Sequence, residues 1–290
     1  MIVNADDFGL TRGVNRAVME LHQAGVLTSA TLMARAAATE DAVFMALSTP
    51  LLGVGCHIVL VDGEPLLPPR EIPGLVDKRT NLFLPKLGPL LGRLLAGRIR
   101  PEEIEAEASA QIGLLQSRGL HLTHIDTHKH AHMFPAVLRP VLRAARALGI
   151  RTVRNPFEPA WSSRATAHAP LLRRAEVGTL RRLQPAFRRI VTEEGFTTTG
   201  GALGVLATGT LNTATITSLL HHMPPGVWEL VTHPGYNDAD LAQVRTRLKA
   251  SRQTEFAALH SIAGGANLDL IGYGELASRQ PGIADDSYAK

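Results

Sequence analysis

The chain has 290 residues, of which 45% are hydrophobic, and a formal net charge of +4. This length and hydrophobic content allow one large α/β domain with a substantial core, or two smaller domains. Charged residues make up only 19% of the chain, which argues against disorder. The single cysteine, Cys56, excludes an intramolecular disulfide and fits a reducing compartment.

The beginning of the chain lacks a basic region followed by a long apolar run, so we expect no secretory leader. No apolar stretch reaches the roughly 18 residues that a membrane-spanning helix needs, and we expect a cytoplasmic protein. Arginines are concentrated in residues 171–193. A solvated helix face is the favoured interpretation, with contact to an anionic partner or a membrane surface as the alternative. Aromatic residues are only 4% of the chain, so we expect no nucleic-acid binding.

The predicted elements alternate between strands and helices along the whole chain. Strands are expected at residues 2–5, 26–33, 52–60, 122–126, 151–154, 196–198, 227–232 and 268–271. Helices are expected between Thr11 and Gly25 and at residues 39–47, 101–117, 135–148, 171–193, 213–222 and 240–262. This order predicts parallel strands with helical crossovers. Seven or eight such units favour a closed or nearly closed barrel, with a doubly wound open sheet as the competing architecture.

The domain organisation follows from the same pattern. We find no break in composition that would mark a linker, so residues 1–290 are expected to form a single domain. Residues 61–100 are rich in proline, glycine and leucine. Because prolines block regular structure, this segment is predicted to be a long loop excursion from the barrel.

Polar side chains follow five of the predicted strands. They are Asp6-Asp7, His57, the 126–128 segment Asp-Thr-His, Arg154-Asn155 and His233. In a β/α-barrel the carboxyl ends of the strands converge on one face, and that face carries the active site. Any one of these positions can be explained by a turn or by a hydrogen-bonded core histidine. All five together predict a functional site at this mouth.

The histidine-rich run from His124 to His132 is the strongest local signal. At strand spacing its polar members share one face, which would crowd up to four imidazoles around the carboxylate of Asp126. Protonated imidazoles would repel one another there, whereas a metal ion binds neutral imidazoles. We therefore favour a metal site over a purely structural cluster.

These groups are suited to amide hydrolysis. Two imidazoles, one carboxylate and an open position are a familiar catalytic metal site, which activates water and polarises a carbonyl. A second carboxylate can take the proton of the water, and an imidazolium can protonate the leaving nitrogen. The candidates for these tasks are Asp6, Asp7, His57, His128 and His233.

Several motifs resemble one known family. Residues 2–10, Ile-Val-Asn-Ala-Asp-Asp-Phe-Gly-Leu, are followed by Gly-Val-Asn at residues 13–15. The later motifs are Gly-Cys-His at residues 55–57, the run at residues 123–132, and His-Pro at residues 233–234. In this order they resemble the YdjC-like carbohydrate deacetylases, also called the ChbG/HpnK family. The resemblance extends from residue 1 to about residue 275.

The resemblance implies an irregular, TIM-like β/α-barrel of the glycoside hydrolase/deacetylase type. It also implies metal-dependent removal of acetyl groups from N-acetylglucosamine-type sugars. Asp7, His57 and His128 resemble the ligands of one divalent ion, Zn²⁺ or Mg²⁺. Asp6 resembles the general base and His233 the general acid.

Three further residues are assigned to the substrate side of the site by the same resemblance: Arg154, His130 and His132. Arg154 is also expected to orient Asp6. Because adjacent residues on a strand point to opposite sides, we expect one of the two aspartates to face the ion and the other to lie beside it.

The exact sugar substrate stays open at this point. Segments at residues 59–63 and 72–77 resemble the hopanoid-associated branch, whereas residues 126–128 and 133–135 resemble the chitooligosaccharide branch. The expected partner is therefore an N-acetylated amino sugar, free or lipid-linked. A metal-dependent phosphoesterase and a non-catalytic sugar-binding protein are the alternatives. A homo-oligomer is also left open.

Overall fold

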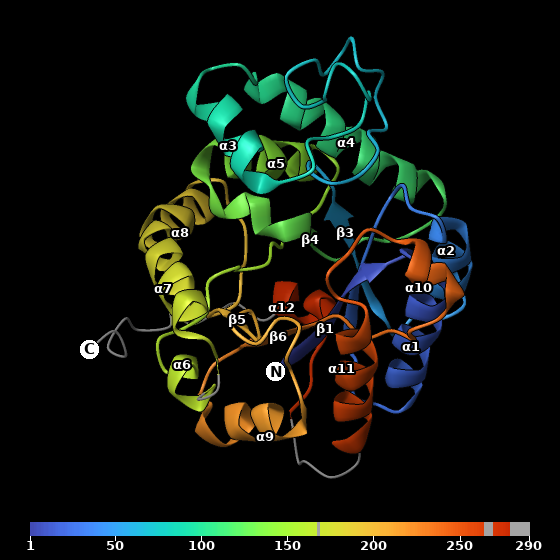
Figure 1. Ribbon diagram of the computed structural model, residues 1–290, viewed down its shortest axis with the longest axis vertical. Helices are drawn as coiled ribbons and strands as arrows, with labels where there is room; N and C mark the ends of the chain where they lie inside the picture. The colour runs from blue at the N-terminus through green and yellow to red at the C-terminus, as the bar shows by residue number, and fades with distance from the viewer. Residues whose placement is uncertain (167–168, 264–268, 279–290) are drawn as a thin grey trace.

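The computed structural model describes residues 1–166, 169–263 and 269–278, and these residues form an α/β fold around one parallel sheet (Figure 1). The strand order is β4-β3-β2-β1-β6-β5. The strands are β1 (Ile2–Phe8), β2 (Ser29–Leu32), β3 (Gly53–Ile58), β4 (Ile125–Thr127), β5 (Ala202–Leu203) and β6 (Glu229–Thr232). All neighbouring strands pair in parallel.

Helices surround the sheet (Figure 1). They are α1 (Arg12–Gln23), α2 (Thr39–Leu47), α3 (Leu87–Leu95), α4 (Pro101–Ser117), α5 (Pro135–Ala147), α6 (Ser162–Ala165), α7 (Leu171–Leu180), α8 (Gln184–Glu193), α9 (Thr213–His222), α10 (Ala239–Gln243), α11 (Ala250–Ser261) and α12 (Tyr273–Ser278), with 3₁₀ helices η1 (His128–Met133) and η2 (Arg181–Leu183). In the described residues no helix is long and apolar enough to cross a membrane.

The central strand β1 is buried along its whole length, as expected for a parallel strand covered on both sides. Val3 and Ala5 belong to the main hydrophobic core. Asn4 and Asp6 alternate with them and contact the polar side chains of His124 and Arg154. The sheet therefore has an apolar face beneath the helices and a polar face that the curled sheet encloses.

The curl of the sheet is shown by Arg154, which directly follows Val153, the residue that bridges to Ile125 of β4. Its guanidinium contacts Asp6 of β1, Asp126 of β4 and Glu229 of β6. One side chain reaches these three strands only if the sheet bends around it. The barrel-like character predicted from the sequence is thus confirmed.

The prediction of a closed barrel with seven or eight strands is wrong. The predicted strands at residues 151–154 and 196–198 are reduced to the single bridges Ile125–Val153 and Thr152–Thr197. Beyond them the Asn155 amide, rather than a backbone ladder, donates to the carbonyls of residues 199 and 200. In the described part of the chain the sheet therefore has six strands and leaves this side irregular.

The last predicted strand, at residues 268–271, is also absent from residues 269–271, while Leu268 lies outside the described residues. The amide of Ile271 donates to the carbonyl of Met1 at 3.0 Å. Ile271, Tyr273 and Leu276 pack with Ile2 in a small separate core. This segment therefore packs at the beginning of β1 without becoming a strand.

Most predicted helices are confirmed, and two predicted long helices are divided. The 171–193 helix is divided into α7 and α8, with Pro185 in the first turn of α8, where proline is tolerated. The 240–262 helix is divided into α10 and α11. The 61–100 excursion contains one helix, α3, and lies beside α4 (Figure 1).

Candidate active site

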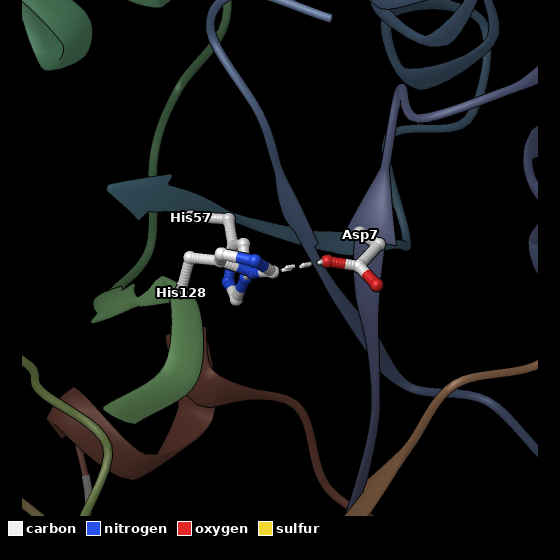
Figure 2. Close-up of side chains that lie close together, drawn as sticks. All are labelled: Asp7, His57 and His128. Carbon is white, nitrogen blue, oxygen red and sulfur yellow. Dashed lines mark hydrogen bonds and ion pairs between the residues drawn. The ribbon is translucent and has the colours of Figure 1, made fainter. Parts of the chain in front are cut away.

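Three of the predicted residues converge at the carboxyl end of the sheet. Asp7 comes from β1, His57 from β3 and His128 from the first position of η1, immediately after β4. Figure 2 shows both imidazoles pointing toward the Asp7 carboxylate. His57 Nε2 lies 3.2 Å from His128 Nδ1, and each nitrogen lies 3.5 Å from Asp7 Oδ1.

The triangle of ligand atoms fits a small divalent cation. Metal–ligand bonds of about 2.0–2.1 Å in a tetrahedral arrangement separate the ligand atoms by about 3.3–3.4 Å. The measured separations of 3.2, 3.5 and 3.5 Å bracket that value. Two imidazoles and one carboxylate are also the ligand types that suit Zn²⁺. Asp7, His57 and His128 are therefore a group that can hold a metal ion.

Asp7 reaches this position because β1 is irregular at its end. The pairing of β1 with β2 shifts register between Ala5 and Phe8, and Asp7 has a φ of 64°. Asp and Asn tolerate this left-handed region better than most residues. The expected alternation is thus interrupted, and the carboxylates of both Asp6 and Asp7 lie next to His57.

The other oxygen of Asp7 is bound by a residue from a distant helix. Arg252 of α11 donates from Nη2 to Asp7 Oδ2 at 2.5 Å. Burial raises the pKa of Asp7, but Arg252, followed by His128 and His57, outweighs it and lowers that pKa well below its usual range. Asp7 is therefore held as a carboxylate, with Oδ1 left for the two histidines.

His57 is oriented by the carboxylate of Asp126. His57 Nδ1 lies 2.8 Å from Asp126 Oδ1, and its Nε2 faces Asp7 and His128. A carboxylate that binds one imidazole nitrogen leaves the other nitrogen available as a metal ligand. Burial lowers the pKa of His57, but Asp126, Asp6 and Asp7 outweigh it and raise the pKa to about 9. The local potential therefore favours a cation.

Asp6 is held by a buried ionic network. Arg154 donates to both of its oxygens, from Nη2 to Oδ1 at 2.6 Å and from Nη1 to Oδ2 at 2.9 Å. The Asn4 amide and the Thr31 hydroxyl donate to Oδ1 at 3.1 and 3.3 Å. Burial raises the pKa of Asp6, but the charge of Arg154 outweighs it and lowers the pKa.

The same arginine excludes a second cation beside the first. Asp6, His57 and Asp126 also lie close enough together to be a potential metal group. Arg154 contacts both carboxylates of that group and also pairs with Glu229 at 2.7 Å. Because this fully buried guanidinium already provides their counter-charge, the geometry favours one ion, at Asp7, His57 and His128.

His233 lies beside the Asp6 carboxylate. Its Nε2 is 3.7 Å from Asp6 Oδ2, and its backbone N–H donates to Glu255 Oε2 at 2.7 Å. The same carboxylate oxygen lies 3.9 Å from His233 Nδ1. His233 and His128 are partly exposed, with 12% and 21% of their side chains accessible, whereas Asp6 and Asp7 are almost fully buried. The two histidines therefore mark the open side of the site.

The prediction that the histidine run shares one strand face is wrong. β4 ends at Thr127, and residues 129 and 130 then adopt positive φ values of 56° and 53°. Because of this turn, the histidine side chains of the run point to different parts of the structure. His124 stacks on the Tyr273 ring 3.8 Å away, at the other end of the sheet, and only His128 enters the metal group.

The two remaining histidines of the run have different surroundings. His132 is fully buried, with Nδ1 2.7 Å from Thr127 Oγ1 and Nε2 3.2 Å from the carbonyl of Arg154. His130 Nδ1 is buried and has no hydrogen-bond partner among the described residues. Their predicted role in substrate binding stays a prediction, and only His130 has a free ring nitrogen for it.

Sequence reasoning missed Arg252, Glu255 and Glu229 as site residues. Arg252 and Glu255 lie three residues apart in a predicted helix, where charged residues normally indicate a solvated face. Glu229 begins the short strand Glu-Leu-Val-Thr, and a lone acidic residue there carries no specific signal. Their partners become visible only when the elements are brought together.

Known proteins are similar to this chain in sequence and in fold. A family model described as YdjC-like protein matches residues 1–266. A carbohydrate deacetylase of Brevibacillus brevis is 43% identical over 162 residues, which are 54% of this chain and 59% of the relative. A chitooligosaccharide deacetylase of Salmonella paratyphi B is 38% identical over 152 residues, which are 52% of this chain and 57% of that relative. The chain thus matches less than two thirds of the length of these relatives.

One solved structure is similar over nearly the whole chain. It is described as a putative cellobiose-phosphate cleavage protein from Enterococcus faecalis V583. The two chains share 26% sequence identity with a TM-score of 0.72, over 95% of this chain and 97% of the other. The fold around the site is therefore one that a crystal structure also contains.

Proposed function

The chain belongs to the YdjC-like protein family, and from that membership and the geometry of the site we propose that it is a metal-dependent carbohydrate N-deacetylase. It would hydrolyse the N-acetyl group of a carbohydrate or glycolipid that contains N-acetylglucosamine. The names of the matched relatives, carbohydrate deacetylase and chitooligosaccharide deacetylase, support this substrate class.

The observation that carries the proposal is the arrangement of two neighbouring carboxylates. Asp7 faces His57 and His128 at distances that suit a cation, while Asp6 is held beside them by Arg154. One carboxylate is thus available to bind a metal and the other to accept a proton. In metal-dependent amide hydrolysis the metal activates water and polarises the carbonyl, and a general base accepts the proton of that water.

Asp7, His57 and His128 would hold the ion, and when bound it would polarise the acetyl carbonyl and activate water. Asp6 would act as the general base. Its carboxylate is charged, and four hydrogen bonds from three buried side chains fix its position, two from Arg154 and one each from Asn4 and Thr31. It would accept one proton as the oxygen of water adds to the acyl carbon.

His233 would act as the general acid. Its Nε2 faces the Asp6 carboxylate across 3.7 Å, and Glu255 anchors its backbone on the other side. As the bond between the acyl carbon and the nitrogen breaks, a proton from His233 would pass to the leaving nitrogen. The products are acetate and the free amine of the sugar.

The sugar substrate would approach from the side where His128 and His233 are partly exposed. We propose that His130 contributes to substrate binding through its unpartnered Nδ1. For Arg154 and His132 the contacts support an indirect contribution to substrate binding. Arg154 binds the Asp6 carboxylate, and His132 Nε2 lies at hydrogen-bond distance from the Arg154 carbonyl. The choice between a chitooligosaccharide and a hopanoid-linked sugar concerns groups beyond the N-acetyl unit.

The two alternative functions have less support. A two-metal phosphoesterase needs a second group of ligands, and Arg154 already occupies the carboxylates that would provide it. A non-catalytic sugar-binding protein would not need a carboxylate and an imidazole beside the metal group. We therefore retain deacetylation as the proposal.

Acetate release from a panel of N-acetylglucosamine compounds tests the proposal. The panel includes free chitooligosaccharides and a lipid-linked sugar, each assayed with chelator and after addition of Zn²⁺ or Mg²⁺. We expect release that chelator abolishes and one of the ions restores. Absence of release from every compound, with metal demonstrably bound, would reject deacetylation of this substrate class.

We also propose a cytoplasmic location and a peripheral membrane contact through residues 171–193, while a homo-oligomer stays a prediction. No residue of α7 is buried, and Leu171 and Leu172 are each 84% exposed beside a basic segment. Exposed leucines next to arginines suit an anionic lipid surface. Flotation with phosphatidylserine vesicles at low and high salt tests the contact, and no binding at low salt would reject it.

A further inference from the structure

Helix α11 lies outside the sheet beside α1, yet it supplies buried charges to the candidate site (Figure 1). Arg252 and Glu255 are each 1% exposed, in a helix that otherwise buries only Ala258 and Leu259. The two charged residues lie on the same helix face because they are three positions apart. A helix that buries two charges must provide partners for them.

Arg252 is bound to the site rather than to the surface. Nη2 donates to Asp7 Oδ2 at 2.5 Å, and Nε donates to the carbonyl of Leu248 at 2.9 Å. Nη1 is buried without a hydrogen-bond partner among the described residues. Among the described residues Asp7 is the one carboxylate in ion-pair contact with this guanidinium, and Glu255 of the same helix interacts with its charge at longer range.

The two oxygens of Asp7 are thus divided between two tasks. Oδ1 faces the nitrogens of His57 and His128 at 3.5 Å, whereas Oδ2 is held by Arg252. A carboxylate with one oxygen already bound presents only the other to a cation. An unrestrained carboxylate is free to use both oxygens, as carboxylate ligands of cations often do.

The loop after β6 fits closely around Arg252. The amide of Gly235 donates to the Arg252 carbonyl at 3.2 Å. A side chain at residue 235 would lie 3.1 Å from Arg252 Cδ and 3.0 Å from Val14 Cγ2, a tight approach that glycine avoids. Arg252 is thus held by its backbone, its side chain and its surroundings, as a preorganised group requires.

We propose that Arg252 is a positioning residue that acts as the resident counter-charge of Asp7. It keeps the buried carboxylate compensated when no metal is bound and leaves only Oδ1 to bind the ion. The inference rests on the proposed metal site formed by Asp7, His57 and His128. It assigns a role to α11, which the sequence motifs of the site do not include.

The proposal predicts an unequal effect on the metal-free and metal-bound protein. Without Arg252 the buried carboxylate of Asp7 loses its main compensating charge and keeps only the two histidines 3.5 Å away, which is unfavourable. A bound cation then takes over that compensation. Removal of the arginine should therefore destabilise the metal-free protein far more than the metal-bound protein.

Thermal unfolding of Arg252→Met with and without saturating Zn²⁺ tests this directly. We expect the metal-free Tm to fall and the rise in Tm on adding Zn²⁺ to exceed that of wild type by about 5 °C or more. Calorimetric titration should show Zn²⁺ binding at least as tightly as in wild type. Arg252→Lys keeps the positive charge and should retain a rise close to that of wild type.

A distant arginine provides the matched control. Arg93 donates to the carbonyls of Gly74 and Val76 in the 61–100 excursion, so Arg93→Met should lower Tm equally with and without Zn²⁺. An equal fall in both states of Arg252→Met, or Zn²⁺ binding weakened tenfold or more, would overturn the inference. No Zn²⁺-dependent rise in wild type would instead reject the proposed zinc site itself.

Discussion

The two aspartates of the site are neighbours in the chain, and each is paired with a different buried arginine. On the Asp6 side, Arg154 lies inside the curled sheet and binds carboxylates from three strands. On the Asp7 side, Arg252 comes from an outer helix and binds one carboxylate. Identical side chains thereby acquire different surroundings. Asp6 is fixed within the sheet, whereas Asp7 retains an oxygen for an ion.

The largest expected effect is on the Asp7 side and follows removal of a metal ligand. His128→Ala should release the bound ion and lower kcat/KM by about 10⁴-fold or more, because water activation and carbonyl polarisation are lost together. Metal content by atomic emission and acetate release measure the two effects. A variant that loses the metal but keeps its activity would show that the metal is not catalytic.

The next effect concerns the centre of the Asp6 side. Arg154→Met removes the only counter-charge that Asp6, Asp126 and Glu229 share in the described structure, so these buried carboxylates lose their main compensating charge. Breaking a buried ion pair typically costs about 3–5 kcal/mol, and we expect a loss of this order in the free energy of unfolding. Denaturant titration of the metal-bound protein measures it. Unchanged stability would contradict the account of this network.

Removal of the proposed acid should have a smaller effect that leaves the metal in place. His233→Gln should lower kcat by about 10²-fold, since general acid catalysis typically contributes about 10²–10⁴-fold. Acetamido substrates with a better leaving nitrogen should be less affected, because they need less protonation. Equal losses for good and poor leaving groups would argue against His233 as the acid.

The smallest effect concerns Glu255, the second charged residue of α11. Glu255→Leu removes the acceptor of the His233 N–H and should lower kcat about tenfold, whereas Glu255→Gln retains an acceptor and most activity. Steady-state kinetics on both variants separates hydrogen bonding from charge. Equal losses in both variants would show that the charge, rather than the hydrogen bond, matters.

The two sides of the site also differ in how well the sequence predicts them. Both aspartates, His57, His128 and Arg154 come at or just after predicted strands, so the convergence of strand ends was enough to bring them together. Parallel pairing is encoded locally, in the alternation of apolar strands and amphipathic helices. The same reasoning predicted most of the helices correctly.

The orientation of Asp7 and its contact with Arg252 depend on features that no local pattern contains. Asp7 turns toward the histidines because β1 shifts register and its φ becomes 64°. Arg252 is separated from it by 245 positions and resembles any arginine of a solvated helix. The closed barrel was overpredicted for a similar reason, because the backbone pairing of residues 151–154 stops after single bridges and the Asn155 side chain binds the chain beyond them.

The division of labour between Asp6 and Asp7 is tested most directly by comparing Asp6→Asn with Asp7→Asn, with bound metal and acetate release measured on the same samples. We predict that Asp6→Asn keeps its metal and loses about 10²–10⁴-fold in kcat. Asp7→Asn should lose both metal and activity. Metal retained by Asp7→Asn and lost by Asp6→Asn would contradict the account.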